Sequence, residues 1–194
     1  MVTIDQIKQL REETNVSVTE CKKVLQEAKG NIEEAKKILK GKSQSFAQKK
    51  VGREAKAGII DSYVHSGKKI GVLLEIHCES DFVARSREFQ KLSHELCLQI
   101  TAMTPLFLEE EDIPEEFLNR EKIFFETQAR NLGKSQKIIN KIVKGKLEKY
   151  KKETSLLSQT WIRDETKTIE DLINEYIAKL GENIFVKKFT RYEL

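Results

Sequence analysis

The first 40 residues repeat one pattern three times: a polar residue of the kind that caps helices, then apolar residues at helical intervals. Three pairs have the spacing at which two side chains satisfy each other's backbone N–H groups at a helix start: Thr3 with Gln6, Ser17 with Glu20, and Asn31 with Glu34. The apolar residues that follow recur every three or four positions: Ile4, Ile7 and Leu10; Cys21, Val24, Leu25 and Ala28; Ile32, Ala35, Ile38 and Leu39. Asn15, Gly30 and Gly41 follow the predicted helices, where a left-handed residue is favoured. The pattern therefore predicts a three-helix module over residues 1–42.

The apolar period then changes from helical to extended. Residues 59–65 and 70–78 read as two strands, and the Ser-Gly-Lys-Lys sequence between them is a hairpin signal. The second strand alternates, with Ile70, Val72, Leu74 and Ile76 on one face and Leu73, Glu75 and His77 on the other. Residues 184–192 read as a further strand, and we expect it to join the hairpin as a third antiparallel strand because an unsupported hairpin is marginal.

The rest of the chain has helical spacing. We expect a long helix after residue 82 that ends before Pro105, a helix from Pro114 to Gly133, a helix capped by Ser135, and a last helix from Thr168 to Gly181. The predicted fold is α+β: a three-helix module (residues 1–42), a basic linker (43–56), and a core (57–194) in which a small three-stranded antiparallel sheet packs with helices.

The junction between the second strand and the long helix is the most informative segment. There Asp81 and Phe82 stand side by side where an apolar strand stops and an amphipathic helix begins. Connecting segments lie on the surface, so Phe82 there is available to a partner, and Asp81 is suited to the first turn of a helix. The alternative is that Phe82 is a local plug of the core, since Phe is often buried.

Composition limits the classes of protein that the chain can belong to. The chain has 194 residues, with 35 Lys and Arg against 31 Asp and Glu, a mild excess that fits an acidic partner as well as a nucleic acid. Its three cysteines, Cys21, Cys78 and Cys97, are odd in number and widely spaced, so they predict neither a disulfide framework nor a zinc site. No apolar run is long enough for a membrane span, and the N-terminus has no targeting pattern, so we expect a protein that works where it is made.

Catalytic motifs are absent from the sequence. The Gly133-Lys134-Ser135 sequence resembles the end of a phosphate loop, but a helix end followed by an N-cap explains it better. His77 and Cys78 suggest a base and a nucleophile, yet adjacent residues of a strand point to opposite faces. We expect no enzyme, no metal site and no cofactor.

With these segments assigned, the chain resembles the elongation factor Ts family. The resemblance runs over essentially all of the chain and rests on these runs: residues 10–14 (LREET), 21–25 (CKKVL), 75–84 (EIHCESDFVA), 142–147 (IVKGKL), 156–159 (LLSQ) and 179–184 (KLGENI). It implies a guanine-nucleotide exchange factor without covalent chemistry, which binds elongation factor Tu in its GDP-bound and nucleotide-free forms and accelerates GDP release. No cofactor, membrane or direct nucleic-acid partner is implied.

The resemblance also implies two contact regions. In that family an Asp-Phe pair enters Tu beside the Mg²⁺ and phosphate site, which assigns the ion-dislocating contact to Ser80, Asp81, Phe82 and Val83, with Phe82 as the wedge. The N-terminal part is similar to the family's ubiquitin-associated-like module. Its Tu-facing edge is carried onto these residues: Arg11, Val18, Thr19 and Lys22.

The chain is similar to the compact form of the family, with one core half. Longer members have a second core half and a coiled-coil insertion, and self-association as a homodimer would restore a missing half. The resemblance implies the cytoplasm of a bacterium, or the stroma of a plastid if a plastid genome encodes the protein.

Two readings from other classes stay open beside it. An RNA-binding module would use the basic linker and the lysines between residues 141 and 152. A cysteine-dependent enzyme would need an unusually reactive Cys78.

Overall fold

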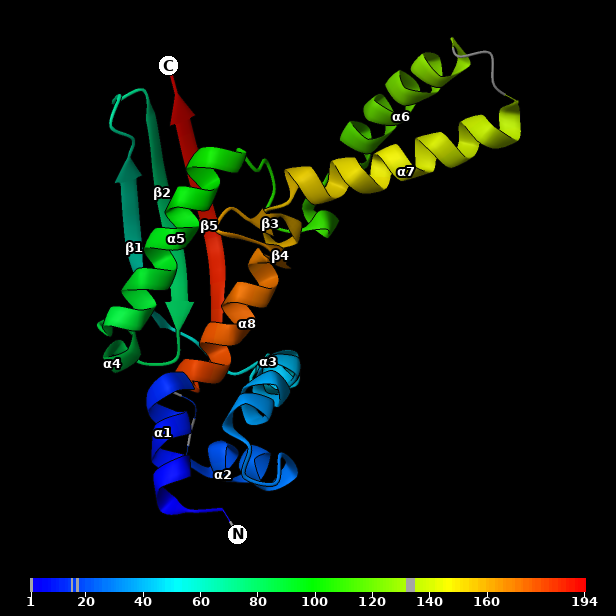
Figure 1. Ribbon diagram of the computed structural model, residues 1–194. Coiled ribbons are helices and arrows are strands. Elements are labelled where there is room, and N and C mark those ends of the chain that lie inside the picture. The colour runs from blue at the N-terminus through cyan, green and yellow to red at the C-terminus, as the bar shows by residue number, and fades with distance from the viewer. Residues whose placement is uncertain (1, 15, 17, 132–134) are drawn as a thin grey trace. The chain divides into compact units, whose positions relative to one another are not determined.

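The predicted α+β fold is confirmed (Figure 1). The computed structural model describes residues 2–14, 16, 18–131 and 135–194, with the side chains of residues 40, 42–44 and 46 outside that description. Its helices and strands, in chain order, are α1 (Ile4–Thr14), α2 (Val18–Glu27), α3 (Ile32–Gln48), β1 (Ala57–Val64), β2 (Ile70–Cys78), α4 (Asp81–Ala84), α5 (Arg87–Met103), the 3-10 helix η1 (Glu110–Asp112), α6 (Glu115–Arg130), α7 (Gln136–Thr154), the 3-10 helix η2 (Leu156–Ser158), β3 (Thr160–Trp161), β4 (Asp164–Thr168), α8 (Ile169–Leu180) and β5 (Ile184–Glu193).

The N-terminal helices begin where the capping residues predict. At α1 the exchange is reciprocal: the Thr3 backbone N–H donates to Gln6 Oε1 (2.9 Å), and the Gln6 N–H donates to Thr3 Oγ1 (3.2 Å). At α3 the Asn31 side chain accepts from the Glu34 N–H (3.1 Å). The pair predicted for α2 includes Ser17, which lies outside the described residues.

The predicted helix ends have different outcomes. Gly30 has a φ of 85°, as expected of a residue that follows a helix, whereas Asn15 is not among the described residues. The predicted end at Gly41 is wrong, because α3 continues through it to Gln48 and takes up part of the predicted linker. A single glycine inside a helix costs only about 1 kcal/mol, and nothing after Gly41 breaks the helix.

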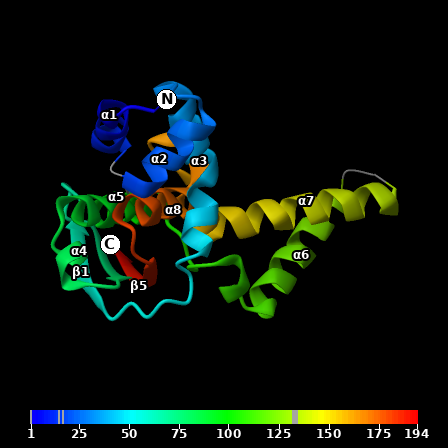
Figure 2. The ribbon, with the colours of Figure 1, turned by 90° about the horizontal axis from the view of Figure 1, so that it is seen from below.

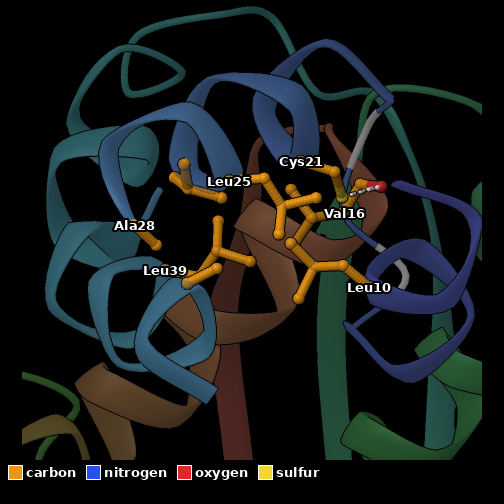
Figure 3. Close-up of a cluster of buried hydrophobic side chains, with 8 residues drawn as sticks. Leu10, Val16, Cys21, Leu25, Ala28 and Leu39 are labelled. Carbon is orange, nitrogen blue, oxygen red and sulfur yellow. Dashed lines mark hydrogen bonds between the residues drawn. The ribbon is translucent and has the colours of Figure 1, made fainter. Parts of the chain in front are cut away.

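The three N-terminal helices enclose a small core of their own (Figure 3). The Cys21 Sγ donates to the Val16 carbonyl oxygen (3.5 Å) inside it, so the thiol is satisfied as well as buried. The buried members are Leu10, Val16, Cys21, Val24, Leu25, Ala28, Ala35 and Leu39. Each predicted apolar stripe therefore supplies residues to one cluster.

The three-stranded sheet has the order β1-β2-β5, with both pairs antiparallel. The predicted hairpin and the predicted third strand are thus confirmed. On β2 the residues Val72, Leu74, Ile76 and Cys78 are buried, as the alternation predicts. Helices α5 and α8 lie on one face of the sheet in both views (Figure 1, Figure 2).

The opposite face of the sheet retains exposed apolar side chains. Alternation and the strand register place five of them there: Ile60 and Val64 from β1, Leu73 from β2, and Phe185 and Tyr192 from β5. Also on this face, Glu75 accepts from the His77 ring (2.8 Å) and pairs with Lys188 (3.3 Å), and the His77 ring stacks on Phe185 with a centroid distance of 5.2 Å. The His77 hydrogen bond, more than Lys188, holds the pKa of Glu75 below its usual value.

Residues 99–169 form a second compact unit. Helices α6 and α7 make a helical hairpin in it, and its core includes Ala129, Ile139 and Val143. The sequence predicted helices in both of these places, one opening at Pro114 and one capped by Ser135.

A buried amide pair organises the base of this second unit. Gln99 donates to Gln159 Oε1 (3.1 Å) and to the Thr160 carbonyl (3.0 Å), and it accepts from the Ile162 N–H (3.0 Å). Strands β3 and β4 form a two-stranded sheet that the sequence did not predict.

The remaining helix boundaries agree with the sequence. Helix α5 ends at Met103 before Pro105, Ser135 precedes α7, and Gly181 follows α8 with a φ of 75°. The predicted end at Gly133 is outside the described residues. Within the described ranges no helix is both long and apolar enough to cross a membrane.

Candidate functional site

The junction after β2 is a short, tightly capped turn. β2 ends at Cys78, and Ser80 is the N-cap of α4 with extended backbone angles (φ −134°, ψ 151°). The Ser80 Oγ accepts a hydrogen bond from the Val83 N–H (3.3 Å). The serine hydroxyl thus fixes the first turn of α4.

The turn exposes its aromatic side chain. Phe82 is 86% exposed, and Asp81 is exposed beside it. Val83 and Ala84 are buried, at 6% and 3% exposed, so they anchor the turn while Phe82 points outward. Phe82 is therefore not a core plug in this structure, and the surface that the turn offers consists of Asp81 and Phe82.

Two carboxylates link this turn to the connection between α8 and β5. Glu182, which lies between α8 and β5, accepts from the Ser80 N–H at Oε2 (3.0 Å) and from the Ser80 hydroxyl at Oε1 (2.5 Å). Glu79 in turn accepts from the Asn183 N–H (2.6 Å). Sequence analysis missed Glu182, although it lies in one of the family-like runs, because nothing local links it to a residue 102 positions earlier.

The predicted N-terminal contact residues are all on the surface. Arg11 is in the last turn of α1, and Val18, Thr19 and Lys22 are in the first half of α2; all four side chains are exposed. They flank the α1–α2 connection from its two sides. The described part of this connection, Val16, is buried in the helical core.

Two cations of the basic linker have partners within the chain. Arg53 pairs with Glu79 (3.8 Å), and its carbonyl oxygen accepts from the Asn183 side chain (3.0 Å). Lys56 pairs with Glu54 (2.6 Å). These pairs lower the positive charge that the linker offers to a phosphate backbone and weigh against the RNA-binding reading.

His77 and Cys78 do not form a catalytic pair. The His77 ring binds Glu75 on the outer face of the sheet, whereas Cys78 is buried on the inner face and donates to the Ser80 carbonyl (3.3 Å). Burial, together with the negative charge of Glu182, raises the pKa of Cys78 to about 11.

Among the described residues there is no group of three or more His, Cys, Asp and Glu that could hold a metal ion.

The cysteines provide a direct test of this geometry. Burial raises the pKa of Cys97 to about 12 and also raises that of Cys21. At pH 8 a thiol whose pKa is about 11 is ionised to about one part in a thousand, so we expect native alkylation by iodoacetamide to be roughly 100-fold slower than in the chain unfolded in guanidinium. The rate at Cys78 should rise about tenfold per pH unit below pH 10, because only the thiolate reacts. Rapid native alkylation of Cys78 would instead support the cysteine-dependent enzyme.

The chain thus combines an N-terminal helical module with a mixed core that presents an exposed aromatic side chain on a capped turn. Comparison with known proteins makes this specific. The family model described as elongation factor TS matches residues 3–194. The elongation factor Ts of Caldanaerobacter subterraneus is 47% identical over 193 residues, which cover 100% of this chain and 96% of that protein. Those of Thermotoga petrophila and Coprothermobacter proteolyticus are 50% and 49% identical and cover 96% and 98% of their own lengths.

The chain therefore belongs to the elongation factor Ts family, whose members take part in translation elongation.

Proposed function

We propose that this protein is the guanine-nucleotide exchange factor of elongation factor Tu. The observation that carries the proposal is the exposed Phe82 beside Asp81, in a chain of this family. The turn that bears these two residues is held in place by the Ser80 cap and by its hydrogen bond to Glu182. An aromatic side chain held out on a rigid turn loses little conformational entropy when it enters a partner.

The mechanism is a coupling between two ligands of Tu. The exchange factor and GDP weaken each other's binding, and this effect is reciprocal in free energy. Phe82 acts as a wedge that displaces the groups around the Mg²⁺ and the diphosphate, and Asp81 makes the polar contact beside it. Each charge-assisted contact that the nucleotide loses is worth about 1.5–3 kcal/mol, so losing two would accelerate release by roughly a hundredfold or more.

The N-terminal module supplies a second contact to Tu through Arg11, Val18, Thr19 and Lys22. These side chains are exposed and follow one another around the α1–α2 connection. A second contact on the same partner raises the effective concentration of the first. The module thus raises affinity, while the turn at Phe82 drives release. We place this activity in a bacterial cytoplasm or a plastid stroma.

The test is release of fluorescent GDP from a bacterial Tu. Release should accelerate in proportion to the concentration of this protein and then saturate. Pull-down on immobilised Tu·GDP and on nucleotide-free Tu gives a second readout. If this protein neither accelerates release nor binds either form of Tu, the proposal is wrong.

We also propose that the chain forms a homodimer through the outer face of its sheet. Five exposed apolar side chains lie on that face, and a two-fold axis would pack them against the same five of a second copy: Ile60, Val64, Leu73, Phe185 and Tyr192. Burial of such side chains contributes about 25 cal/mol per Å² of apolar surface.

Light scattering at micromolar concentration checks the homodimer. For the wild-type protein we expect a molar mass of twice that of one chain. For Leu73→Lys we expect the molar mass of a monomer, because an unpaired ammonium group cannot be buried in the interface at low cost. Leu106→Lys is the matched control, since Leu106 is equally apolar and exposed but lies outside the sheet. A monomeric wild-type protein at this concentration would contradict the proposal.

A further inference from the structure

The turn that carries Phe82 is held by two segments far apart in the chain. Glu79 and Ser80 come directly after β2, and Glu182 and Asn183 come just before β5. Their hydrogen bonds are crossed: the Glu182 carboxylate binds the backbone N–H and the hydroxyl of Ser80, and the Glu79 carboxylate binds the Asn183 N–H. We call these four residues the crossed carboxylate clamp.

The clamp acts on Phe82 through one serine. The Ser80 hydroxyl donates its proton to Glu182 (2.5 Å), so its oxygen is left to accept from the Val83 N–H (3.3 Å). With the proton committed to the carboxylate, the hydroxyl cannot rotate to donate elsewhere. Glu182 thus sets the orientation of the group that caps the short helix on which Phe82 stands.

Helix α4 depends on its caps, which are Ser80 at its start and the hydrogen bonds of Arg85 and Ser86 at its end. Helix α4 has only four residues, and a helix of this length has almost no stability by itself. The buried neighbours Val83 and Ala84 fix its inner side, but the direction of the exposed side chain depends on the first turn and hence on its cap.

We propose that Glu182 is a positioning residue for exchange: through Ser80 it holds the Phe82 wedge in the orientation that enters the partner. Glu182 itself need not touch the partner. The inference rests on the proposed function, and it assigns a role to a residue outside the contact regions.

The first experiment does not depend on exchange activity. Amide hydrogen exchange of the free protein is compared for wild type, Glu182→Ala and Glu193→Ala. Glu193 is an exposed glutamate at the far end of β5 and serves as the matched control. We expect the Ser80 and Val83 amides to exchange at least tenfold faster in Glu182→Ala only. Unchanged exchange at both amides would overturn the clamp, whatever happens to GDP release.

The second experiment is a double-mutant cycle on release of fluorescent GDP from Tu. We expect Glu182→Ala to reduce the acceleration about tenfold in the wild-type background and less than twofold in the Phe82→Ala background, because a positioning residue has no effect once the group it positions is gone. A full tenfold loss in both backgrounds, or no loss in either, would overturn the inference.

Two conservative variants separate positioning from folding. Ser80→Ala removes the hydroxyl and should lose about as much acceleration as Glu182→Ala, whereas Ser80→Thr, which keeps the hydroxyl, should lose less than Ser80→Ala. Glu182→Gln, which retains one acceptor oxygen, should fold even if Glu182→Ala does not, and should show about a threefold loss. Equal acceleration by Ser80→Thr and Ser80→Ala would also overturn the role of the hydroxyl. If wild type itself gives no acceleration, the proposed function fails, and the amide exchange result still decides the clamp.

Discussion

Replacing Phe82 with alanine should reduce the acceleration of GDP release roughly 30- to 150-fold while leaving the fold intact. Full burial of a Phe side chain is worth about 2–3 kcal/mol, and each 1.36 kcal/mol in a barrier is a factor of ten in rate. Because Phe82 is 86% exposed in the free protein, its truncation removes little internal packing, and the free energy of unfolding should change by less than about 0.5 kcal/mol. The measurement is the rate of fluorescent GDP release from Tu over a range of exchange factor concentrations.

The matched control for Phe82→Ala is Phe124→Ala. Phe124 is also an exposed aromatic residue, at 58%, but it stands on α6 and belongs to neither predicted contact region. The Phe124→Ala variant should accelerate GDP release to within about twofold of the wild-type protein. If release remains fast with Phe82→Ala, Phe82 is not the wedge, and the main contribution must come from the N-terminal module and the rest of the core. Equal losses in the two variants would point to a general effect of removing surface aromatics.

Much of the fold follows from local patterns in the sequence. β2 was predicted to the residue, because an apolar residue at every second position from Ile70 to Cys78 suits a strand with one buried face. Gly41 shows the limit of such rules. A glycine ends a helix only when the residues after it prefer another structure, and here the polar residues that follow are compatible with helix.

Other features of the fold could not be predicted from short stretches of the sequence. The β3–β4 pair consists of strands of two and five residues, too short to show an alternating pattern. The turn at Asp81 and Phe82 was found from the sequence because its two exposed residues are adjacent in the chain and directly follow the strand. Glu182 was missed because its partner is Ser80, and only folding brings the two together.

Gly58 links the sheet to the site and should be one of the least replaceable residues of the core. It lies in β1 opposite His77, with a φ of 155°, and a Cβ atom added to it would lie 2.3 Å from the Ile76 carbonyl oxygen and 2.9 Å from the His77 Cα. Both are backbone atoms, so no side-chain rotation can relieve the clash. β1 would have to move away from β2 and break ladder hydrogen bonds.

Gly58→Ala should therefore destabilise the protein by roughly 3–5 kcal/mol, among the largest effects of a single methyl group. Gly71→Ala is the matched control in the same hairpin, because an added Cβ there meets no atom within 4 Å; its effect should be within about 1 kcal/mol. Chemical denaturation followed by circular dichroism measures both. Residues 79–82 continue directly from β2. Under conditions where the Gly58→Ala variant is still folded, it should therefore accelerate GDP release from Tu less than the wild-type protein does. Equal stability of the two alanine variants would show that β1 can shift at little cost and that the close approach at Gly58 does not hold the sheet.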